Sequence, residues 1–134
     1  MFPGDLVGPI PAWYTPASGG VTAYLESLDK LEALGAELIL PSHGDAIEQP
    51  ADAIRRIRSM LLERESALLE LLSNGARSFS ELNRRSFANP SVQFFPGWGI
   101  TESHLLKLER DGTIRRDGET IRLTQEQPTE TAGK

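Results

Sequence analysis

Few side chains in this sequence could bind a metal ion or transfer a proton. The chain has no cysteine and two histidines, His43 and His104, so a transition metal would have to be held by imidazole and carboxylate groups. Two histidines exclude a self-contained site built from four or five imidazoles. Asp5 follows Pro-Gly near the N-terminus, and its neighbours alone favour a loop aspartate that caps a turn. Residue types by themselves therefore favour structural roles for all three.

Composition excludes several classes of protein. The 134 residues amount to about one domain, and 14 basic residues against 19 acidic ones give a net charge of −5. No apolar run approaches the roughly 18 residues of a membrane span. The N-terminus lacks the basic and then apolar pattern of a secretory signal. We therefore expect a cytoplasmic protein that makes no membrane contact.

The first half of the chain predicts a helix followed by a strand. From Gly20, apolar residues recur at three- and four-residue steps, which predicts an amphipathic helix that Gly35 closes. Residues 37–40 form a short apolar run that Pro41 stops, which predicts a buried strand. His43 follows in the loop after that strand, a common place for ligand chemistry in α/β folds.

A second, longer helix is predicted after Pro50. Asp52 is a plausible N-cap, and apolar residues at helical spacing continue to Leu72 before Gly75 ends the pattern. A helix running to Asn74 would be about 33 Å long. Such a helix could pack against two small hydrophobic cores, one along each of its halves. The middle of the helix is therefore the expected domain junction.

Shorter elements follow Gly75. Ser78 or Ser80 can cap a helix that runs to Arg85, and Thr101 can cap a third helix that ends at Gly112. We interpret His104 as packing at the edge of that third helix.

Asp117-Gly118 predicts a β-hairpin with a two-residue loop between residues 113 and 123. In that register Arg116 opposes Glu119, and Ile114 opposes Ile121, so the two isoleucines share one face. Three helices followed by a hairpin is the element order of a winged-helix domain.

Two groups of residues, taken in this order and spacing, resemble a known family. The first group is Phe2-Pro-Gly-Asp5, Tyr24-Leu-Glu-Ser-Leu28 and Ile39-Leu-Pro-Ser-His-Gly44, and the second is Arg64-Glu65, His104-Leu-Leu-Lys-Leu108 and Gly112. Together they resemble the C-terminal half of a metallo-β-lactamase-fold hydrolase. The matching branch contains beta-lactamase-like two and hydroxyacylglutathione-hydrolase-like proteins, and it carries a C-terminal winged helix.

The resemblance implies an α+β fold in three parts. Residues 1–50 would be the C-terminal remnant of an αββα metallo-β-lactamase domain. Residues 51–123 would be the long linking helix with a winged-helix domain. Residues 124–134, which are polar, are expected to form a disordered tail.

The resemblance also implies a zinc site. Asp5 would bridge two metal ions, and His43 would be the last ligand of a Pro-Gly-His-Gly motif in which Ser42 replaces the first glycine. The family's other ligands, from a His-x-His-x-Asp-His motif and one more histidine, are absent from this sequence. Catalytic zinc needs about three protein ligands and an open position for water, whose metal-bound hydroxide is the nucleophile. We therefore expect this chain alone to bind no zinc and to be inactive, whereas the complete enzyme would hydrolyse a thioester, an ester or a phosphodiester.

The same resemblance bears on partners. Without the family's N-terminal half, the apolar face of the first helix would be exposed at Val21, Tyr24, Leu25 and Leu28. Exposed patches of this kind are interaction sites or aggregation hazards. We therefore expect a homo-oligomer, or pairing with a chain that supplies the absent half.

A winged-helix interaction protein or nucleic-acid-binding protein is the alternative function. The third helix of such a domain often enters the major groove, so the candidate phosphate contacts are Lys107, Arg110, Arg115, Arg116 and Arg122. Residues 76–123 hold eight basic residues against six acidic ones, a small surplus for binding phosphates. Packing or dimer formation is therefore the favoured role of this domain, and nucleic acid is not the expected partner.

Two other features have ordinary explanations. Arg55, Arg56 and Arg58 could form an anion patch, but nearby glutamates favour a solvated helix face. Trp13 and Trp98 lie among glycines and prolines, and we interpret both as local packing anchors.

Overall fold

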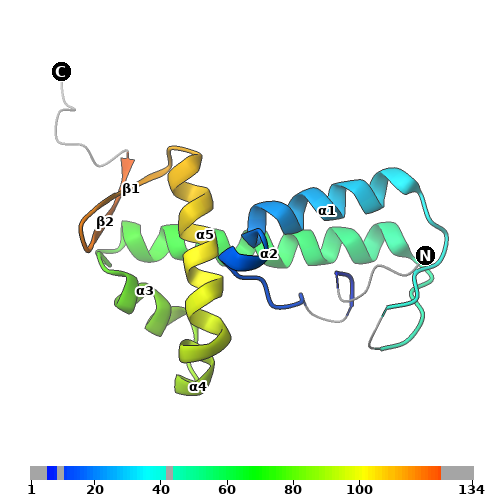
Figure 1. The fold of residues 1–134 in the computed structure, drawn as a ribbon, viewed down its shortest axis with the longest axis horizontal. Helices are drawn as coiled ribbons and strands as arrows, with labels where there is room; N and C mark the ends of the chain where they lie inside the picture. The colour runs from blue at the N-terminus through cyan, green and yellow to red at the C-terminus, as the bar shows by residue number, and fades with distance from the viewer. Residues whose placement is uncertain (1–5, 9–10, 42–43, 125–134) are drawn as a thin grey trace.

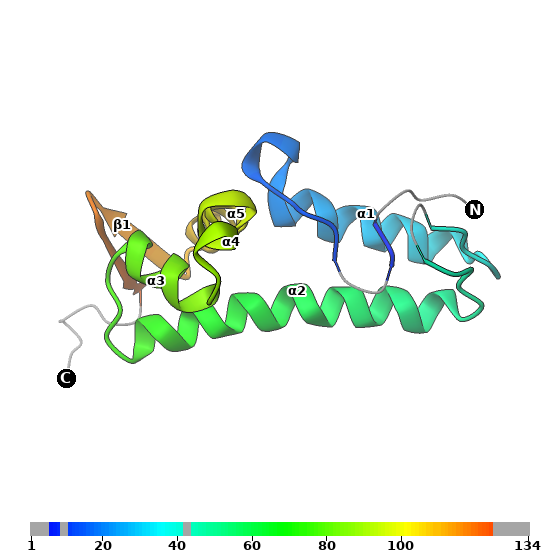
Figure 2. The same ribbon diagram turned by 90° about the horizontal axis from the view of Figure 1, so that it is seen from below.

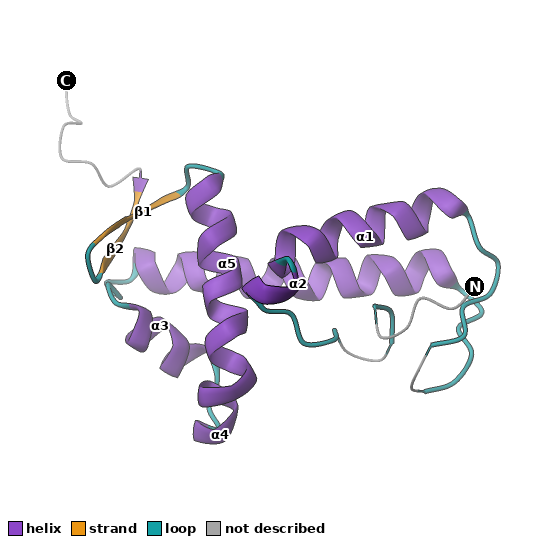
Figure 3. Ribbon diagram, in the orientation of Figure 1, coloured by secondary structure: helices purple, strands orange, loops and turns teal. Residues whose placement is uncertain are grey.

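In the computed structural model of the protein, the described residues are 6–8, 11–41 and 44–124. Figure 1 shows the chain passing through the following elements: the 3-10 turn η1 (Pro16–Ser18), helices α1 (Gly20–Leu34), α2 (Pro50–Ser73), α3 (Phe79–Ser86) and α4 (Pro90–Val92), the wide turn η2 (Gln93–Gly97), helix α5 (Trp98–Arg110), and strands β1 (Ile114–Asp117) and β2 (Thr120–Leu123). Helices dominate this part of the chain, and Figure 3 shows the two short strands as its sheet. The predicted tail lies outside the described residues apart from Thr124. Within the described ranges, no helix combines the length and apolarity needed to cross a membrane.

Helix α2 runs along the molecule, and other elements pack against both of its halves. Figure 2 shows α1 beside its first half, and α3, α5 and the hairpin gathered at its second half. Pro50 occupies the first turn and Gln49 is the N-cap, so the prediction of Asp52 as the cap is wrong. Proline is favoured at the first helical position because its fixed φ suits the helix. Asp52 instead pairs with Arg55 at 2.8 Å within the first turn.

Two hydrophobic clusters follow each other along α2. The first contains α1, the N-terminal loop, the α2 residues up to Leu61 and Ile100 of α5, and the second contains α2 from Leu68, α3, Leu105 and Leu108 of α5, and the hairpin. Glu65 lies between Leu61 and Leu68 at helical spacing, so α2 places a carboxylate on its buried face between the clusters.

The apolar face of α1 is covered within the chain, which contradicts the expectation that it would be exposed. Val21 and Leu28 are fully buried, Tyr24 is nearly so, and Leu25 packs partly buried against the same cluster. The N-terminal loop crosses this face, where the Tyr24 hydroxyl donates to the Leu6 carbonyl at 2.7 Å. The N-terminal loop and α2 therefore cover this face, which was predicted to need the absent half of the fold.

The strand predicted at residues 37–40 is wrong. Ile39 forms an isolated antiparallel bridge with Ile47, and it is the buried residue of the run. Leu38 and Leu40 are 43% and 37% exposed. A strand needs neighbours along its length to pair its backbone groups, and among the described residues Ile39 finds this one partner.

Helix α5 begins earlier than predicted. It starts at Trp98, so Thr101 lies inside the helix rather than at its cap, and its hydroxyl donates to Asn83 Oδ1 at 2.8 Å. The preceding turn contains a cis peptide bond between Phe95 and Pro96. Leu105 and Leu108 are buried, as the apolar spacing predicted.

The hairpin forms in a different register from the predicted one. Asp117 pairs with Thr120 and Ile114 with Leu123, so the loop is Gly118-Glu119, with Gly118 at a φ of 64°. Ile114 and Ile121 still share one buried face, because the shift is two residues along a pattern of period two. The hydrophobic pattern therefore could not distinguish the predicted register from the observed one.

Candidate functional site

A buried polar chain joins three elements at the junction of the two clusters. The Tyr14 hydroxyl from the N-terminal loop lies 2.7 Å from Nε2 of His104 on α5, and Nδ1 of His104 lies 3.2 Å from Oε1 of Glu65 on α2. His104 is completely buried, and Tyr14 and Glu65 are 4% and 9% exposed. The prediction that His104 packs at the edge of its helix is therefore wrong, because the imidazole lies at the centre of the molecule.

The protonation states in this chain follow from the donors and acceptors. Burial opposes ionisation of Glu65, but hydrogen bonds from His104 and Lys107 outweigh it and lower the pKa of the carboxyl group. A carboxylate accepts hydrogen bonds only, so Nδ1 of His104 carries the proton, and Nε2 accepts from the Tyr14 hydroxyl. Burial lowers the pKa of His104 and raises that of Tyr14, so both side chains are neutral near pH 7.

Lys107 extends the chain to the surface. Its ammonium group lies 2.9 Å from Oε2 of Glu65 and 2.9 Å from Asp111. Burial alone would lower the pKa of Lys107, but the two carboxylates stabilise its charged form more strongly. The net effect is a raised pKa. Each oxygen of the buried Glu65 carboxylate therefore has a donor, which is what burying such a group requires.

This polar chain has a structural role. His104 has no exposed surface, so it cannot touch a ligand, and both of its ring nitrogens are already used. The hydrogen bonds hold the N-terminal loop against α5 and α2. Tyr14 and Glu65 were not predicted as site residues, although the placement of Glu65 between Leu61 and Leu68 on the buried stripe indicated a buried carboxylate.

A cleft of about 890 Å³ opens beside Tyr14, between the N-terminal loop, α2 and the segment after α3. Its lining includes Trp13, and Arg64 with its guanidinium 4.6 Å above the Phe87 ring. Two arginines and two glutamates lie around it, Arg64, Arg85, Glu63 and Glu70. Because both charges are equally present, the lining selects neither an anion nor a cation.

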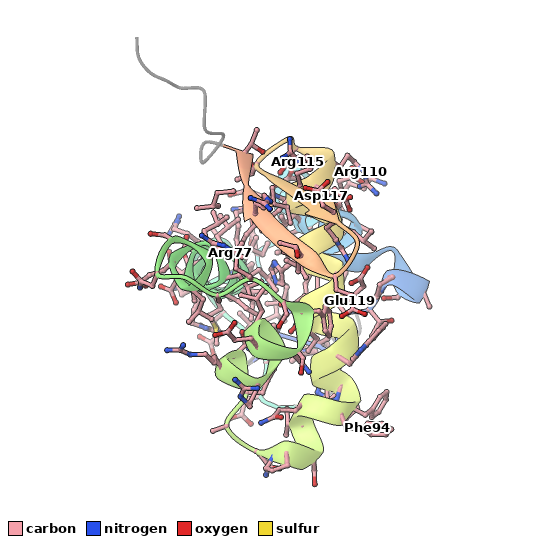
Figure 4. All side chains as sticks on the ribbon, turned by 90° about the vertical axis from the view of Figure 1, so that its left-hand side faces the viewer. Arg77, Phe94, Arg110, Arg115, Asp117 and Glu119 are labelled. Carbon is pink, nitrogen blue, oxygen red and sulfur yellow. The ribbon has the colours of Figure 1, made fainter. Side chains whose placement is uncertain are left out.

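Most of the candidate phosphate contacts are engaged in ion pairs. Lys107 pairs with Glu65 and Asp111, and Arg116 pairs with Glu102 at 2.9 Å and Glu109 at 3.4 Å. Arg115 and Arg122 share Asp117 at 3.2 and 3.6 Å. Figure 4 shows Arg110, Arg115 and Asp117 together at one end of the molecule. Acidic side chains are therefore interspersed with this basic set.

The three arginines at the start of α2 also have partners within the chain. Arg58 pairs with Asp29 and Glu32 of α1, both at 2.9 Å, and Arg56 donates to the Gly8 carbonyl. Together with the Arg55–Asp52 pair, these contacts occupy all three guanidinium groups within the chain, and Arg58, only 24% exposed, links α2 to α1 rather than facing solvent.

The pKa of His104 has a measurable consequence for stability. Burial holds its folded pKa below the unfolded value of 6.5, so the unfolded chain takes up the proton first as the pH falls. The neutral imidazole therefore stabilises the fold fully above pH 6.5 and progressively less as the pH drops towards the folded pKa. We expect the midpoint of thermal unfolding to fall between pH 7 and 5.

A His104→Gln variant should be less stable at pH 7 and should show a shallower pH dependence over the same interval. Leu28→Ala, which destabilises the fold without removing a titratable group, should keep the dependence of the unaltered chain. Equal pH dependence in the His104 variant and the unaltered chain would contradict a buried neutral imidazole.

The sequence-predicted metal ligands Asp5 and His43 lie outside the described residues. Among the residues that the structure does describe, no three His, Asp or Glu side chains are grouped so that they could hold a metal ion. The described residues thus do not fit a zinc centre.

The fold of this chain is similar to part of two solved structures. One is a metallo-beta-lactamase family protein from Thermus thermophilus, 23% identical with a TM-score of 0.69, and the other is a beta-lactamase domain protein from Burkholderia ambifaria, 22% identical with a TM-score of 0.74. Each match covers 90% of this chain and 40% of the other protein, so the chain spans less than half the length of either. No protein-family model and no curated protein sequence matches the chain. The described residues therefore share a metallo-β-lactamase-type fold over that portion.

Proposed function

We propose that residues 1–134 are the C-terminal part of a metallo-β-lactamase-superfamily hydrolase. The observation that carries the proposal is the similarity of the chain, over 90% of its length, to two structures of metallo-β-lactamase type. The positions of Asp5 and His43 in the sequence agree with it, because each lies in a motif that resembles a ligand motif of that family.

The second half of the chain is proposed to be a winged-helix domain. The end of α2, α3 and α5 precede the β1–β2 hairpin, which is the required order of elements. The hairpin contacts α5 and α2, so Ile114 and Ile121 close the second cluster. These contacts support a packing role for this domain.

The metal site is proposed to be shared with residues outside this sequence. Asp5 and His43 are two ligands where catalytic zinc needs about three, and the described residues hold no group of three such side chains by themselves. We therefore propose that positions 1–134 alone do not hydrolyse substrate. With the remaining ligands present, the reaction would be hydrolysis of a thioester, an ester or a phosphodiester.

The test begins with the DNA immediately upstream of the Met1 codon. The proposal expects a His-x-His-x-Asp-His motif there, either in frame or in a neighbouring reading frame. The protein, or pair of proteins, that contains this motif should hydrolyse at least one of the three ester classes. Asp5→Asn and His43→Ala should each lower kcat/KM by about 100-fold or more, because the loss of a mere outer-shell partner of a metal ligand already costs about 10–100-fold.

Asp45→Asn is the control for that experiment. Asp45 lies two residues from His43 and is not part of either ligand motif, so its replacement should leave kcat/KM within a few-fold of the original. Absence of the upstream motif, or full activity in the Asp5 variant, would contradict the proposal.

Nucleic-acid binding is not supported by a comparable observation. The ion pairs of Lys107, Arg115, Arg116 and Arg122 would have to be exchanged for phosphate contacts. We expect no salt-dependent binding of duplex DNA in electrophoretic mobility assays at moderate ionic strength. Binding that weakens steeply with salt and is lost in Arg115→Ala and Arg116→Ala would instead establish the nucleic-acid alternative.

A further inference from the structure

Two segments that are far apart in the sequence share an unusual absence of charge. Residues 6–25 and 86–101 contain no Asp, Glu, Lys or Arg, although a quarter of the whole chain is charged. The fold brings parts of both segments together where η1 meets the start of α5. Cores of protein interfaces are depleted in charge and enriched in aromatic residues.

Four aromatic rings are exposed on this uncharged surface. Phe94 is 85% exposed, Trp13 64%, Phe95 63% and Trp98 54%. The two tryptophans were predicted to be local packing anchors, and each does pack on a neighbouring ring, but more than half of each side chain stays exposed. We call Trp13, Phe94, Phe95 and Trp98 the aromatic face. Figure 4 shows Phe94 projecting outward from the lower end of the molecule, away from the charged hairpin.

The aromatic face contains a groove of about 540 Å³. Thr15, Pro16 and Ala17 form one side of it, and Phe94, Phe95 and Trp98 line the other. Its lining is almost entirely apolar. The groove therefore fits an apolar side chain and offers little to a charged or strongly polar ligand.

Close packing holds the two sides of the groove in place. A Cβ atom on Gly99 would lie 2.7 Å from Cγ2 of Thr15, so η1 approaches α5 where only glycine leaves room. Edge-to-face packing joins Trp13 to Phe95 at 5.3 Å between ring centres, and Trp98 packs on Phe79 at 5.2 Å. The face is thus ordered before any partner binds, which lowers the entropic cost of association.

We propose that the aromatic face is the contact surface of a homodimer, in which Phe94 of each copy enters the groove of the other. A projecting ring and an apolar groove on the same patch satisfy the requirement of a twofold interface, where one surface must complement itself. Because both copies present the same patch, a charge-free surface also avoids opposing like charges.

The size of the face agrees with a weak but specific dimer. A fully exposed aromatic side chain contributes about 150–250 Å², so the four rings together expose roughly 400–650 Å² per copy. Covering both copies would remove about 800–1,300 Å², and the flanking groove residues add to this. Specific interfaces begin at about 1,000–1,200 Å² of total area. The mass of the chain in solution tests this proposal separately from the zinc content and activity that test the proposed hydrolase function.

Light scattering after size-exclusion chromatography tests the proposal on the whole chain. At about 100 μM, where a small interface of this size is expected to be occupied, the mass should be twice the 14.7 kDa of one chain. Phe94→Lys should return the mass to one chain, without loss of folding because Phe94 is already 85% exposed. Leu34→Lys is the matched control, since Leu34 is 68% exposed on α1 outside the aromatic face, and it should leave the dimer intact.

Tryptophan emission locates the contact independently. Trp13 and Trp98 are the two tryptophans of the chain, and both belong to the aromatic face. Emission should move to shorter wavelength as the concentration rises from about 1 to 100 μM, in the unaltered chain and in Leu34→Lys but not in Phe94→Lys.

Three results would overturn the proposal. A single-chain mass at the highest concentration would show that the face does not bind a second copy, including the case in which another polypeptide covers it. A dimer that survives in Phe94→Lys, or one that forms without a change in tryptophan emission, would place the contact on another surface.

Discussion

Replacing Glu65 by alanine should lower the free energy of unfolding by roughly 1.5–3 kcal/mol, the usual contribution of hydrogen bonds to a charged group. Nδ1 of His104 would lose its acceptor inside the protein, and Lys107 would lose one of its two carboxylates. The remaining Lys107–Asp111 pair places the expected value towards the lower end of this range. Urea denaturation at pH 7, followed by circular dichroism, measures the change.

Glu63→Ala is the control for this variant. Glu63 is exposed on the same helix, so its replacement should change the free energy of unfolding by no more than about 0.5 kcal/mol. Equal effects of the two variants would mean that Glu65 is not the buried acceptor that links α2 to α5.

Leu28→Ala should cost about 2–5 kcal/mol, because Leu28 is fully buried and its removal leaves a cavity. This value distinguishes a covered α1 from the exposed face that the sequence had suggested. If α1 needed another chain to cover it, the same change in the isolated chain would have little effect. Chemical denaturation of the isolated chain at low concentration, where association is absent, provides the measurement.

Leu34→Ala on the same helix serves as the comparison. Leu34 is 68% exposed at the end of α1, so the expected loss is within about 0.5 kcal/mol. A small loss for Leu28→Ala, matching that of Leu34→Ala, would show that α1 is not packed against α2 and the N-terminal loop in solution.

Helical periodicity in the sequence was sufficient to find the main helices. Helix α1 begins at Gly20 and gives way to Gly35 with a φ of 64°, as its apolar spacing and following glycine predicted. The apolar residues of a buried helical face recur every three or four positions. A short stretch of sequence therefore contains all the information needed to predict the helix. The helix starts were less predictable: Asp52 and Thr101 both have residue types that favour a cap, but Pro50 and Trp98 begin their helices first.

Features that depend on distant residues were not predictable in the same way. A strand at residues 37–40 requires neighbouring strands, and the apolar run alone carries no information about whether they are present. Tyr14 and His104 are 90 positions apart, and no local pattern indicates that their side chains meet. Glu65 looks like one of many charged residues on α2 until its position between Leu61 and Leu68 is considered.

The candidate metal ligands came from family resemblance and not from any local pattern. Residue types and spacing alone favoured structural roles for Asp5 and His43, because one carboxylate and one imidazole do not define a metal site. Both residues lie outside the described part of the chain, so the proposed roles rest on their motifs and on the shared fold.

The metal content of the purified chain shows whether residues 1–134 can form a zinc site by themselves. Residues 1–134 should be dialysed against micromolar zinc and analysed for bound metal, alongside Asp5→Asn and His43→Ala. We predict substoichiometric zinc that is the same in all three proteins, because two ligands fall short of the three that a catalytic site needs. One or two zinc ions per chain, lost in both variants, would contradict the claim that the site requires ligands from outside this sequence.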